Sequence, residues 1–278
     1  MIRIVIDSSS DYQLQEATAQ NMEFVSISVT VGEQSYMDGV NLDRDEFYKN
    51  LAESTEFPKT AQPSPQAFLD IFQHAKECGD DVICILLSSG LSGTCQSAHL
   101  AKNMAEYDNI YIVDSLSATI GIKILVEYAD KLRNENVSAA EIAAKLEDVK
   151  ARIRIFAGVD TLEFLCRGGR VSHASAAIGE LANIKPIINV NDEGKVVVLG
   201  KCLGKNKALR FIMDKMEEAP ADGNFPIYTV YTYGTENTEK LEDKLTKAGT
   251  AFTSRQQIGA TIGAHVGPGA FGVIYIEK

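Results

Sequence analysis

Short apolar runs alternate with segments of helical period in the first half of the chain. Four of these runs are predicted as strands: residues 2–6, 24–31, 81–87 and 109–114. The third run is apolar enough to be buried on both faces of a sheet. Between the runs, N-cap and capping-box residues mark helix starts at Asp43, Ser64 and Ser138. Strands that alternate with helices in this way predict a mainly parallel sheet with helices on its faces.

The pattern changes after an amphipathic segment that predicts a helix over 139–152. Further strands are predicted at 155–160, 186–190, 195–200, 226–233, 251–256 and 271–276, and further helices at 205–218 and 236–248. The strands at 186–190 and 195–200 flank a turn sequence and predict an antiparallel hairpin. We therefore expect an α/β protein of two α/β domains, residues 1–152 and 153–278, with a ligand crevice between them.

Composition and charge exclude several classes of function. The chain has 278 residues and a formal charge of −11, from 27 Lys and Arg against 38 Asp and Glu. This excess of acid repels phosphate backbones and argues against a nucleic-acid partner. No segment reaches the ~20 continuous apolar residues that a membrane span needs, and the first residues do not resemble a signal peptide, so we expect a cytoplasmic protein. Five scattered cysteines indicate neither a disulfide framework nor a zinc site.

The sequence contains partial matches to known catalytic, phosphate-binding and calcium-binding motifs, but none of these matches is complete. Residues 90–93 lack the last position of a nucleophile elbow, and residues 200–207 contain Gly-Lys twice without a phosphate-binding loop. Residues 189–194 begin like a calcium loop, but Gly200 stands where the closing glutamate belongs. These near misses favour a site that binds a ligand over a site that cleaves one.

Hydroxyl side chains gather in two stretches beside predicted strands and helices. The first stretch is a turn that contains Thr60, and the second is SSGLSGT, which ends in Ser92, Gly93 and Thr94 before a helical pattern. A helix start offers free N–H groups, which suit a carboxylate or a phosphate. Ordinary capping and a tight turn are the alternative interpretation of both stretches.

Two further stretches carry basic side chains. Arg167 and Arg170 bracket a Gly-Gly pair, and guanidinium groups favour bidentate contacts to oxyanions. The alternative for this stretch is a solvated helix end. His265 lies in a glycine-dense segment, 263–269, which we expect to be a loop before the last strand. A histidine in such a loop has little core to pack against, so we take it as a candidate ligand contact.

Six motifs, in the same order, resemble those of the DegV family of bacterial fatty-acid-binding proteins. They are TAQPSP, SSGLSGT followed by CQSA, VDS, TLEFLCRGGR, NIKPII and HVGPGAFGV. The resemblance runs from IDSSSD to the last strand and so covers the whole chain. It implies two α/β domains that hold a fatty acid in the crevice between them, with no cofactor or metal besides this ligand.

The resemblance also implies a site for the fatty-acid head group. It assigns the carboxylate to Thr60 and Ser92, with the backbone around Gly93 and Thr94 and the side chain of His265 nearby. Physical chemistry agrees with this assignment, because a buried carboxylate needs hydrogen bonds, and hydroxyls, N–H groups or a protonated histidine can supply them. We expect no fixed Lys or Arg there, because a full counter-charge would make the carboxylate less nucleophilic.

The same family includes the FakB proteins, which present a bound fatty acid to a separate ATP-dependent kinase. Six basic residues and one acid lie within residues 195–215 of this otherwise acidic chain. We expect Lys201 and Lys205, together with Arg167 and Arg170, to contact a kinase or the new phosphate. A solvated helix face is the alternative interpretation of the basic segment.

Two other functions remain open. Leu203 stands where the family usually has an arginine, and this change favours a lipid sensor or transport protein without a kinase partner. An acyl ester hydrolase would use Ser92 as nucleophile and His265 as base. This function requires the two side chains to lie within hydrogen-bond reach of each other.

Overall fold

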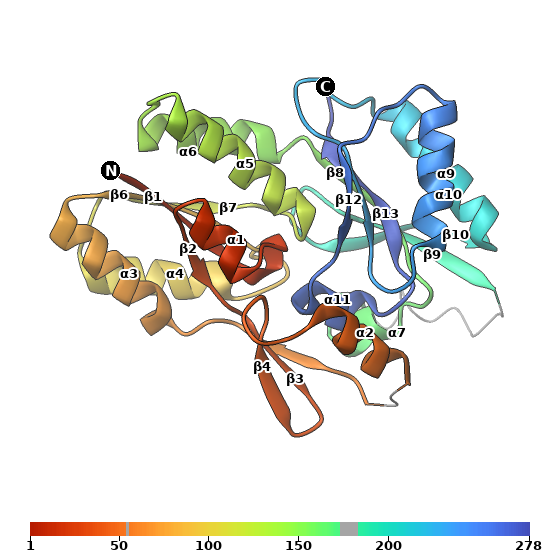
Figure 1. Cartoon of the computed structure of the whole chain (residues 1–278), viewed down its shortest axis with the longest axis horizontal. Helices are drawn as coiled ribbons and strands as arrows, with labels where there is room; N and C mark the ends of the chain where they lie inside the picture. The colour runs from red at the N-terminus through yellow and green to blue at the C-terminus, as the bar shows by residue number, and fades with distance from the viewer. Residues whose placement is uncertain (54–55, 173–182) are drawn as a thin grey trace.

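The computed structural model describes residues 1–53, 56–172 and 183–278. Its first half contains a parallel four-stranded sheet of order β2-β1-β6-β7. The strands are β1 (Ile2–Asp7), β2 (Met22–Val25), β6 (Asp81–Leu86) and β7 (Ile110–Asp114). One face is covered by α3 (Pro65–Cys78) and α4 (Thr94–Ala105), and the other by α5 (Ile120–Asn134) and α6 (Ala139–Lys150) (Figure 1). The predicted parallel sheet with helices on both faces is confirmed.

A mixed six-stranded sheet of order β10-β9-β8-β13-β11-β12 lies in the second half. The strands are β8 (Ile153–Gly158), β9 (Ile184–Val190), β10 (Val196–Leu203), β11 (Tyr228–Tyr231), β12 (Ser254–Gln257) and β13 (Phe271–Ile276). Helices α9 (Lys205–Glu218) and α10 (Glu236–Lys247) pack on one face, and the opposite face turns toward the first half (Figure 1). The predicted antiparallel hairpin is formed by β9 and β10.

A small antiparallel sheet and several short helices lie beside the two large sheets. The small sheet has the order β4-β3-β5, from β3 (Ser28–Val31), β4 (Gln34–Met37) and β5 (Lys59–Ala61). The short helices are η1 (Ser8–Ser10), α1 (Leu14–Ala19), α2 (Arg44–Glu53), α7 (Glu163–Arg167) and α11 (Ala260–Val266). Because α11 contacts α2, β3 and α7, it joins segments from both halves of the chain.

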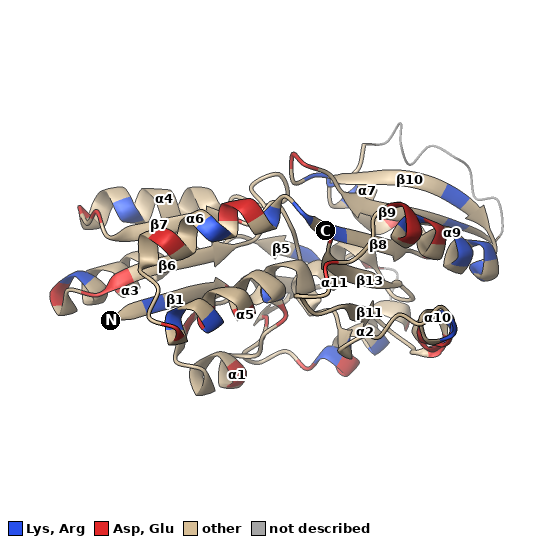
Figure 2. Ribbon diagram, turned by 90° about the horizontal axis from the view of Figure 1, so that it is seen from above, with Lys and Arg blue, Asp and Glu red and all other residues tan. Residues whose placement is uncertain are grey.

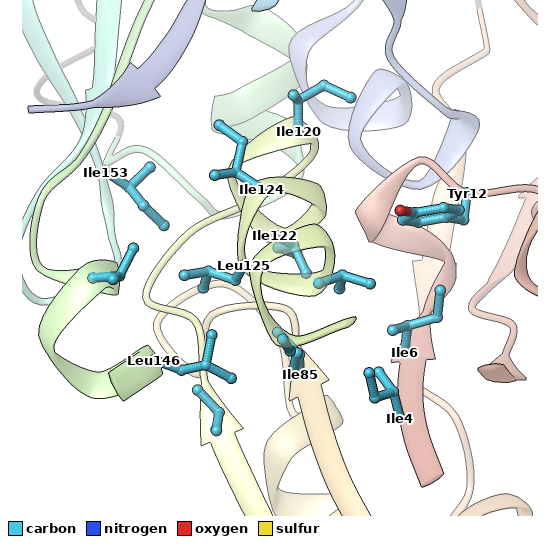
Figure 3. Close-up of a cluster of buried hydrophobic side chains, with 14 of the residues drawn as sticks. Ile4, Ile6, Tyr12, Ile85, Ile120, Ile122, Ile124, Leu125, Leu146 and Ile153 are labelled. Atoms are coloured by element: carbon cyan, nitrogen blue, oxygen red, sulfur yellow. The ribbon is translucent and has the colours of Figure 1, made fainter. Parts of the chain in front are cut away.

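The largest hydrophobic cluster connects the two large sheets through α5 (Figure 3). On one side, Ile4 and Ile85 of the parallel sheet are buried in the same cluster as Ile122 of α5. On the other side, Ile153 and Ile274 of the six-stranded sheet belong to it too. Burial of these aliphatic side chains is the main stabilising contribution to the arrangement of the two sheets.

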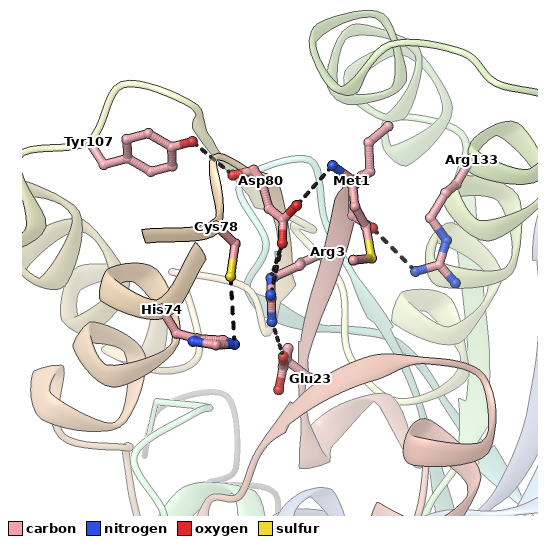
Figure 4. A network of polar contacts seen from close by, with 9 residues as sticks. Met1, Arg3, Glu23, His74, Cys78, Asp80, Tyr107 and Arg133 are labelled. Atoms are coloured by element: carbon pink, nitrogen blue, oxygen red, sulfur yellow. Dashed lines mark hydrogen bonds and ion pairs between the residues drawn. The ribbon is translucent and has the colours of Figure 1, made fainter. Parts of the chain in front are cut away.

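Polar contacts fix the amino ends of the parallel strands (Figure 4). Arg3 on β1 pairs with Asp80 at 2.8 Å and with Glu23 on β2 at 3.0 Å. The Tyr107 hydroxyl donates to the carbonyl of Asp80 at 3.0 Å. This network lies at the edge of the sheet opposite to the carboxyl ends, where ligand sites of α/β proteins are usually built.

Two predictions of local structure are wrong. Residues 24–31 do not form one strand, because β2 ends at Val25 and β3 begins at Ser28 in a different sheet. The segment 263–269 is not entirely a loop, because α11 extends to Val266 and carries His265 in its last turn. The boundary at 152/153 falls between α6 and β8, and as a division into domains it stays a prediction.

Positions of charged residues are spread over the helices of both halves, and Lys and Arg occur on β10 and, together with acidic residues, on α9 (Figure 2). Within the described ranges, no helix has both the length and the apolar character needed to cross a membrane.

Candidate ligand-binding site

A cavity of about 350 Å³ lies between the inner face of the six-stranded sheet and the loops at the carboxyl ends of the parallel sheet. Most of its wall is apolar. The six-stranded sheet contributes Ile155, Ile188, Val190, Val230 and Ile274. The first half and α11 contribute Ile27, Leu87, Leu91, Ile262 and Val266. A wall of this composition suits the apolar chain of a ligand.

Polar side chains gather in one part of this cavity. Thr60, Ser92, Gly93 and His265 all line it, although they come from β5, the loop after β6 and α11. Thr60 Oγ1 lies 2.9 Å from His265 Nε2, within hydrogen-bond distance. The structure therefore brings together four of the five residues that the sequence indicated for a head group.

The fifth of these residues, Thr94, lies outside the cavity and is hydrogen-bonded to Ser92. It is fully buried as the first residue of α4. Its hydroxyl lies 2.8 Å from the Ser92 hydroxyl, and its N–H donates to Ser92 Oγ at 3.3 Å. Thr94 therefore orients Ser92 and does not itself line the cavity.

Gln62 lines the cavity as well, and reasoning from the sequence missed it. Its Nε2 donates to Ser97 Oγ on α4 at 3.1 Å, and the side chain lies across Gly93. A β-carbon added at Gly93 would overlap the Gln62 amide. A signal was available, because Gln62 belongs to the same TAQPSP motif as Thr60, two residues further along the chain.

The start of the SSGLSGT loop is fixed against the β9–β10 hairpin. Ser88 Oγ donates to the carbonyl of Gly194 at 2.8 Å and accepts from the N–H of Gly90 at 3.1 Å. A β-carbon at Gly90 would lie 2.7 Å from that same carbonyl. A turn from the second half of the chain thus packs on the loop that carries Ser92.

Carboxylates from the first half hold the beginning of α11. Asp11 accepts from the N–H of Gly259 at 2.8 Å, and Asp38 accepts from the N–H of Thr261 at 2.8 Å. These bonds satisfy N–H groups that the first turn of a helix leaves free. Burial raises the pKa of Asp11 to about 6. The two carboxylates fix the helix that carries His265.

The imidazole of His265 is uncharged at neutral pH. Burial, and to a smaller extent the positive charge of Arg170, lower its pKa to about 4. Nδ1 is buried and has no hydrogen-bond partner among the residues that the structure describes. The protonated histidine that we considered as a hydrogen-bond donor is therefore not the form that this structure supports at pH 7.

Arg170 also lines the cavity. The expectation that no Lys or Arg bonds directly to the carboxylate stays a prediction, and the position of Arg170 argues against it. Its guanidinium donates to the carbonyls of Leu91, at 3.0 Å, and of Gly168. No carboxylate in the described part of the chain pairs with it. Burial lowers the pKa of this guanidinium. A half-buried cation whose partners among the described residues are two carbonyls is suited to contact an anionic ligand.

Arg167 lies apart from Arg170, on the outside of the molecule. It pairs with Glu163 at 2.8 Å, and its guanidinium lies 4.0 Å from the centre of the Phe57 ring. The chain turns between the two arginines at Gly169, which has a φ of +74°. The structure thus places one of the two predicted phosphate contacts in the cavity wall and the other at the surface.

Comparison with known proteins agrees with this geometry. A family model described as an uncharacterised protein of the DegV family matches residues 1–278. The chain belongs to the DegV family. A DegV domain-containing protein of Caldanaerobacter subterraneus subsp. tengcongensis is 35% identical over 285 residues, which cover 100% of this chain and 99% of that relative.

Solved structures of DegV proteins have the same α/β fold. A fatty-acid-binding DegV family protein from Thermus thermophilus gives a TM-score of 0.88 at 30% identity. A fatty-acid-binding DegV family protein from Streptococcus agalactiae gives 0.89 at 28%, and a stearic-acid-binding protein from Eubacterium ventriosum gives 0.88 at 28%. Each comparison covers 100% of this chain and 99% of the other chain. The predicted DegV-like fold is confirmed.

In this DegV protein, Lys201 and Lys205 lie away from the cavity. Lys201 is on β10 and Lys205 begins α9, and neither lines the cavity. Lys205 instead borders a separate surface depression with Asp160 and Tyr233. The structure does not bring the two lysines together with Arg170. A contact of these lysines with a kinase would therefore lie outside the cavity.

The arrangement needed for an ester hydrolase is not formed in this DegV protein. Ser92 Oγ is hydrogen-bonded to Thr94, whereas His265 Nε2 is bonded to Thr60. Among the described residues, Ser92 and His265 share no hydrogen bond, and no group of three or more His, Cys, Asp or Glu side chains is placed to hold a metal ion. The geometry favours binding over cleavage.

Proposed function

We propose that this DegV protein binds a long-chain fatty acid, with the acyl chain in the cavity and the carboxylate beside Thr60, Ser92 and His265. One observation carries the proposal: most of the cavity wall is apolar, and polar groups gather around the Thr60–His265 pair. Solved DegV relatives that are named for fatty-acid binding support it. In this proposal the protein is a cytoplasmic carrier that needs no cofactor or metal.

The apolar wall accounts for retention of the acyl chain. Each methylene that leaves water contributes ~0.8 kcal/mol, so a chain of about 14 methylenes gains roughly 11 kcal/mol. This free energy opposes release into water. A protein that delivers such a ligand must therefore enclose the chain until a partner removes or modifies it.

The polar part of the cavity accounts for recognition of the carboxylate. A buried carboxylate costs several kcal/mol unless it is hydrogen-bonded. The hydroxyls of Thr60 and Ser92 can each donate one hydrogen bond, and His265 can donate another after a change of tautomer or protonation. Arg170, in the same wall, supplies positive charge near the anion. Together these groups replace the water that the carboxylate loses.

Two ligands with the same tail test the proposed head-group site. Protein freed of lipid is titrated by calorimetry with palmitic acid and with the alcohol of equal chain length. Hydrogen bonds to charged groups contribute about 1.5–3 kcal/mol each, so the acid should bind at least about tenfold tighter. Equal affinities would contradict carboxylate recognition while leaving lipid binding in place.

We further propose that the bound fatty acid is presented to a separate fatty acid kinase, which forms the acyl-phosphate. The position of Arg170 supports this proposal, because a cation in the wall can contact the carboxylate before the reaction and the phosphate after it. A lipid sensor or transport protein is the second candidate. It is favoured by Leu203, which is 56% exposed where the family usually has an arginine.

Reconstitution with the kinase of the host, ATP and fatty acid separates the two candidates. A carrier yields acyl-phosphate, and a sensor yields none. Charge reversal by Lys201→Glu and Lys205→Glu should slow the reaction at unchanged fatty-acid affinity, since both lysines lie away from the cavity. Equal rates in the wild type and the variants would exclude these lysines from the kinase contact.

A further inference from the structure

A second, smaller cavity lies against the main one. Its volume is about 70 Å³, a fifth of the 350 Å³ of the main cavity. Ile155 on β8 and Val190 on β9 line both spaces. We name the smaller space the side chamber; it is lined by Leu116, Ser117, Lys150, Ala151, Ile153, Ile155 and residues 154 and 190–192.

The strand register shows that the side chamber continues the main cavity along one face of the sheet. Ala157 lies opposite Ile188 in the β8–β9 ladder, and both line the main cavity. The ladder pairs only residues 157–158 with 187–188. Beyond it, Ile155 on β8 and Val190 on β9 each lie two residues from the Ala157–Ile188 pair, on the same face of their strands, and both line the two cavities. The next position of β8 on this face, Ile153, lines the side chamber. Because alternate residues of a strand share a face, these side chains form one continuous row.

The opposite wall follows the same order. Ala118 and Thr119 line the main cavity, and the two preceding residues, Leu116 and Ser117, line the side chamber. Both walls therefore pass from the larger space into the smaller one, and the two side chains that the spaces share stand at the passage.

We propose that Ile155 and Val190 set the upper limit of the acyl-chain length by closing the main cavity against the side chamber. The inference rests on the fatty-acid binding proposed above and names which fatty acids the site accepts. A chain that fits the main cavity binds with its end against these two side chains. A longer chain has its last carbons excluded, unless a smaller residue opens the passage.

The side chamber is suited to hold the end of an acyl chain. Its apolar wall is formed by Leu116, Ile153, Ile155 and Val190, which include the two side chains shared with the main cavity. Ser117, Asn191 and Asp192 form a polar part, in which Asp192 is exposed to solvent. Its cationic side chains, Lys150 and Arg154, each pair with a glutamate at 2.5 Å, so their charges are balanced outside the chamber and their stems can line it. A group the size of water occupies about 30 Å³, so the chamber has room for about two further carbons.

A matched pair of variants tests the proposal. Ile155→Ala opens the passage. Ile274→Ala removes the same three carbons from the neighbouring position on β13, which lies opposite Ile155 and lines the main cavity but not the side chamber. Each protein is freed of lipid and titrated with saturated fatty acids of fourteen to twenty-two carbons. Both variants enlarge the main cavity, and Ile155→Ala alone also joins it to the chamber.

The expected result is a shift of the preferred chain length. In Ile155→Ala, the chain of highest affinity should be about two carbons longer than in Ile274→Ala. At that chain length, Ile155→Ala should bind the fatty acid about fifteenfold more tightly than Ile274→Ala does. This ratio corresponds to the burial of two further methylenes at about 0.8 kcal/mol each. Val190→Ala should shift the preference in the same direction and replaces Ile155→Ala in the comparison if that variant does not fold.

Equal preferences in Ile155→Ala and Ile274→Ala would overturn the proposal, and so would an unchanged preference in Val190→Ala. This failure differs from a failure of fatty-acid binding. A wild-type protein that binds no fatty acid contradicts the proposed function, whereas a wild-type protein that binds one, with no shift in the variants, contradicts only the proposed limit on chain length.

Discussion

Gly168 and Gly169 are adjacent residues with different physical requirements. A β-carbon added at Gly168 would overlap the ring of His265, so Gly168→Ala should displace the imidazole. Loss of one hydrogen bond to a charged head group costs about 1.5 kcal/mol or more, and we expect fatty-acid affinity to fall about tenfold in calorimetric titration.

Gly169→Ala is the matched control. Its φ of +74° strains any other residue, but among the described residues no heavy atom beyond its two chain neighbours lies within 4 Å of an added β-carbon. Alanine can adopt this φ at a cost of about 1 kcal/mol in the free energy of unfolding, so the turn that places Arg170 is kept. Fatty-acid affinity should therefore stay unchanged. Equal losses of affinity in the two variants would show that the position of His265 is irrelevant to binding.

The titration of His265 reports whether an anion binds beside it. In the protein freed of lipid, the imidazole should titrate near pH 4, the pKa that its burial and the charge of Arg170 produce. A carboxylate placed at hydrogen-bond distance favours the charged imidazole and should raise the pKa of His265. The measurement is the imidazole proton shift by NMR with and without palmitic acid. An identical titration in both samples would place the carboxylate elsewhere.

The sequence could indicate candidate site residues that have polar or ionisable side chains, but it could not indicate the apolar residues that line the cavity. Thr60, Ser92 and His265 stand out because hydroxyls and an imidazole beside glycines suggest ligand contacts. Thr94 belongs to the same motif, yet it supports Ser92 from a buried position. The position of Arg170 in the cavity depends on the turn at Gly169. The sequence alone does not show in which direction the chain continues after that turn.

At the scale of elements, α11 depends on a carboxylate far away in the sequence. Asp38 accepts hydrogen bonds from the N–H and the hydroxyl of Thr261 in the first turn of the helix. Asp38→Ala should lower the free energy of unfolding by about 2 kcal/mol, because it removes a cap and leaves buried donors unpaired. Fatty-acid affinity should fall too, since α11 carries His265. Urea denaturation and calorimetry measure the two effects.

Ser138→Ala is the control for this prediction. Ser138 caps α6 with a capping box, and its side chain lies outside both cavities. The loss of that cap should cost about 1 kcal/mol of stability at unchanged affinity. If Asp38→Ala also left the affinity unchanged, the position of α11 would not depend on this carboxylate.

Elements with strong local signals were predictable, whereas elements decided by distant contacts were not. Capping signals gave the starts of α3 and α6 correctly. The run 24–31 has the composition of one strand, but Ser26 donates to the carbonyl of Asp38 and the chain changes sheet there. Helix α11 is rich in glycine and so resembles a loop. Gly263 is nevertheless suited to it, because a β-carbon there would overlap Tyr48 of α2.

At the scale of the whole molecule, the buried carboxylates make stability depend on pH. Burial raises the pKa of Asp11 to about 6, above the ~3.9 of an unfolded chain. Between these values the folded state holds a proton that the unfolded state has lost. The stability that protonated Asp11 contributes to the folded state is therefore fully present below about pH 4 and is lost as the pH rises through about 6. Asp11→Asn removes this dependence.

Urea denaturation of the wild type and Asp11→Asn between pH 4 and 6 measures the effect. The free energy of unfolding of the wild type, relative to the variant, should fall by about 1.4 kcal/mol per pH unit over this range. His265 has the opposite dependence, because its lowered pKa gives stability that is lost as the pH falls toward 4. That term is present in both proteins and cancels. A constant difference between the proteins would contradict a raised pKa at Asp11.

The cavity as a whole could not be derived from the sequence, although its polar residues could be named. Its apolar wall includes residues from Ile27 to Ile274, each of which also fits an ordinary hydrophobic core. Only the packing of the six-stranded sheet against the loops of the first half shows which of them line the cavity. The resemblance to DegV proteins suggested the kind of ligand that we propose, and the structure shows the apolar wall that would hold its chain.

The central claim, that the cavity holds a fatty acid, is tested most directly by the lipid that the protein carries. Protein purified under native conditions is denatured in organic solvent, and the released lipid is identified and quantified by mass spectrometry beside an unrelated protein purified in the same way. We predict a long-chain fatty acid in roughly equal amount to the protein chain. Release of no more fatty acid than from the unrelated protein would contradict the account.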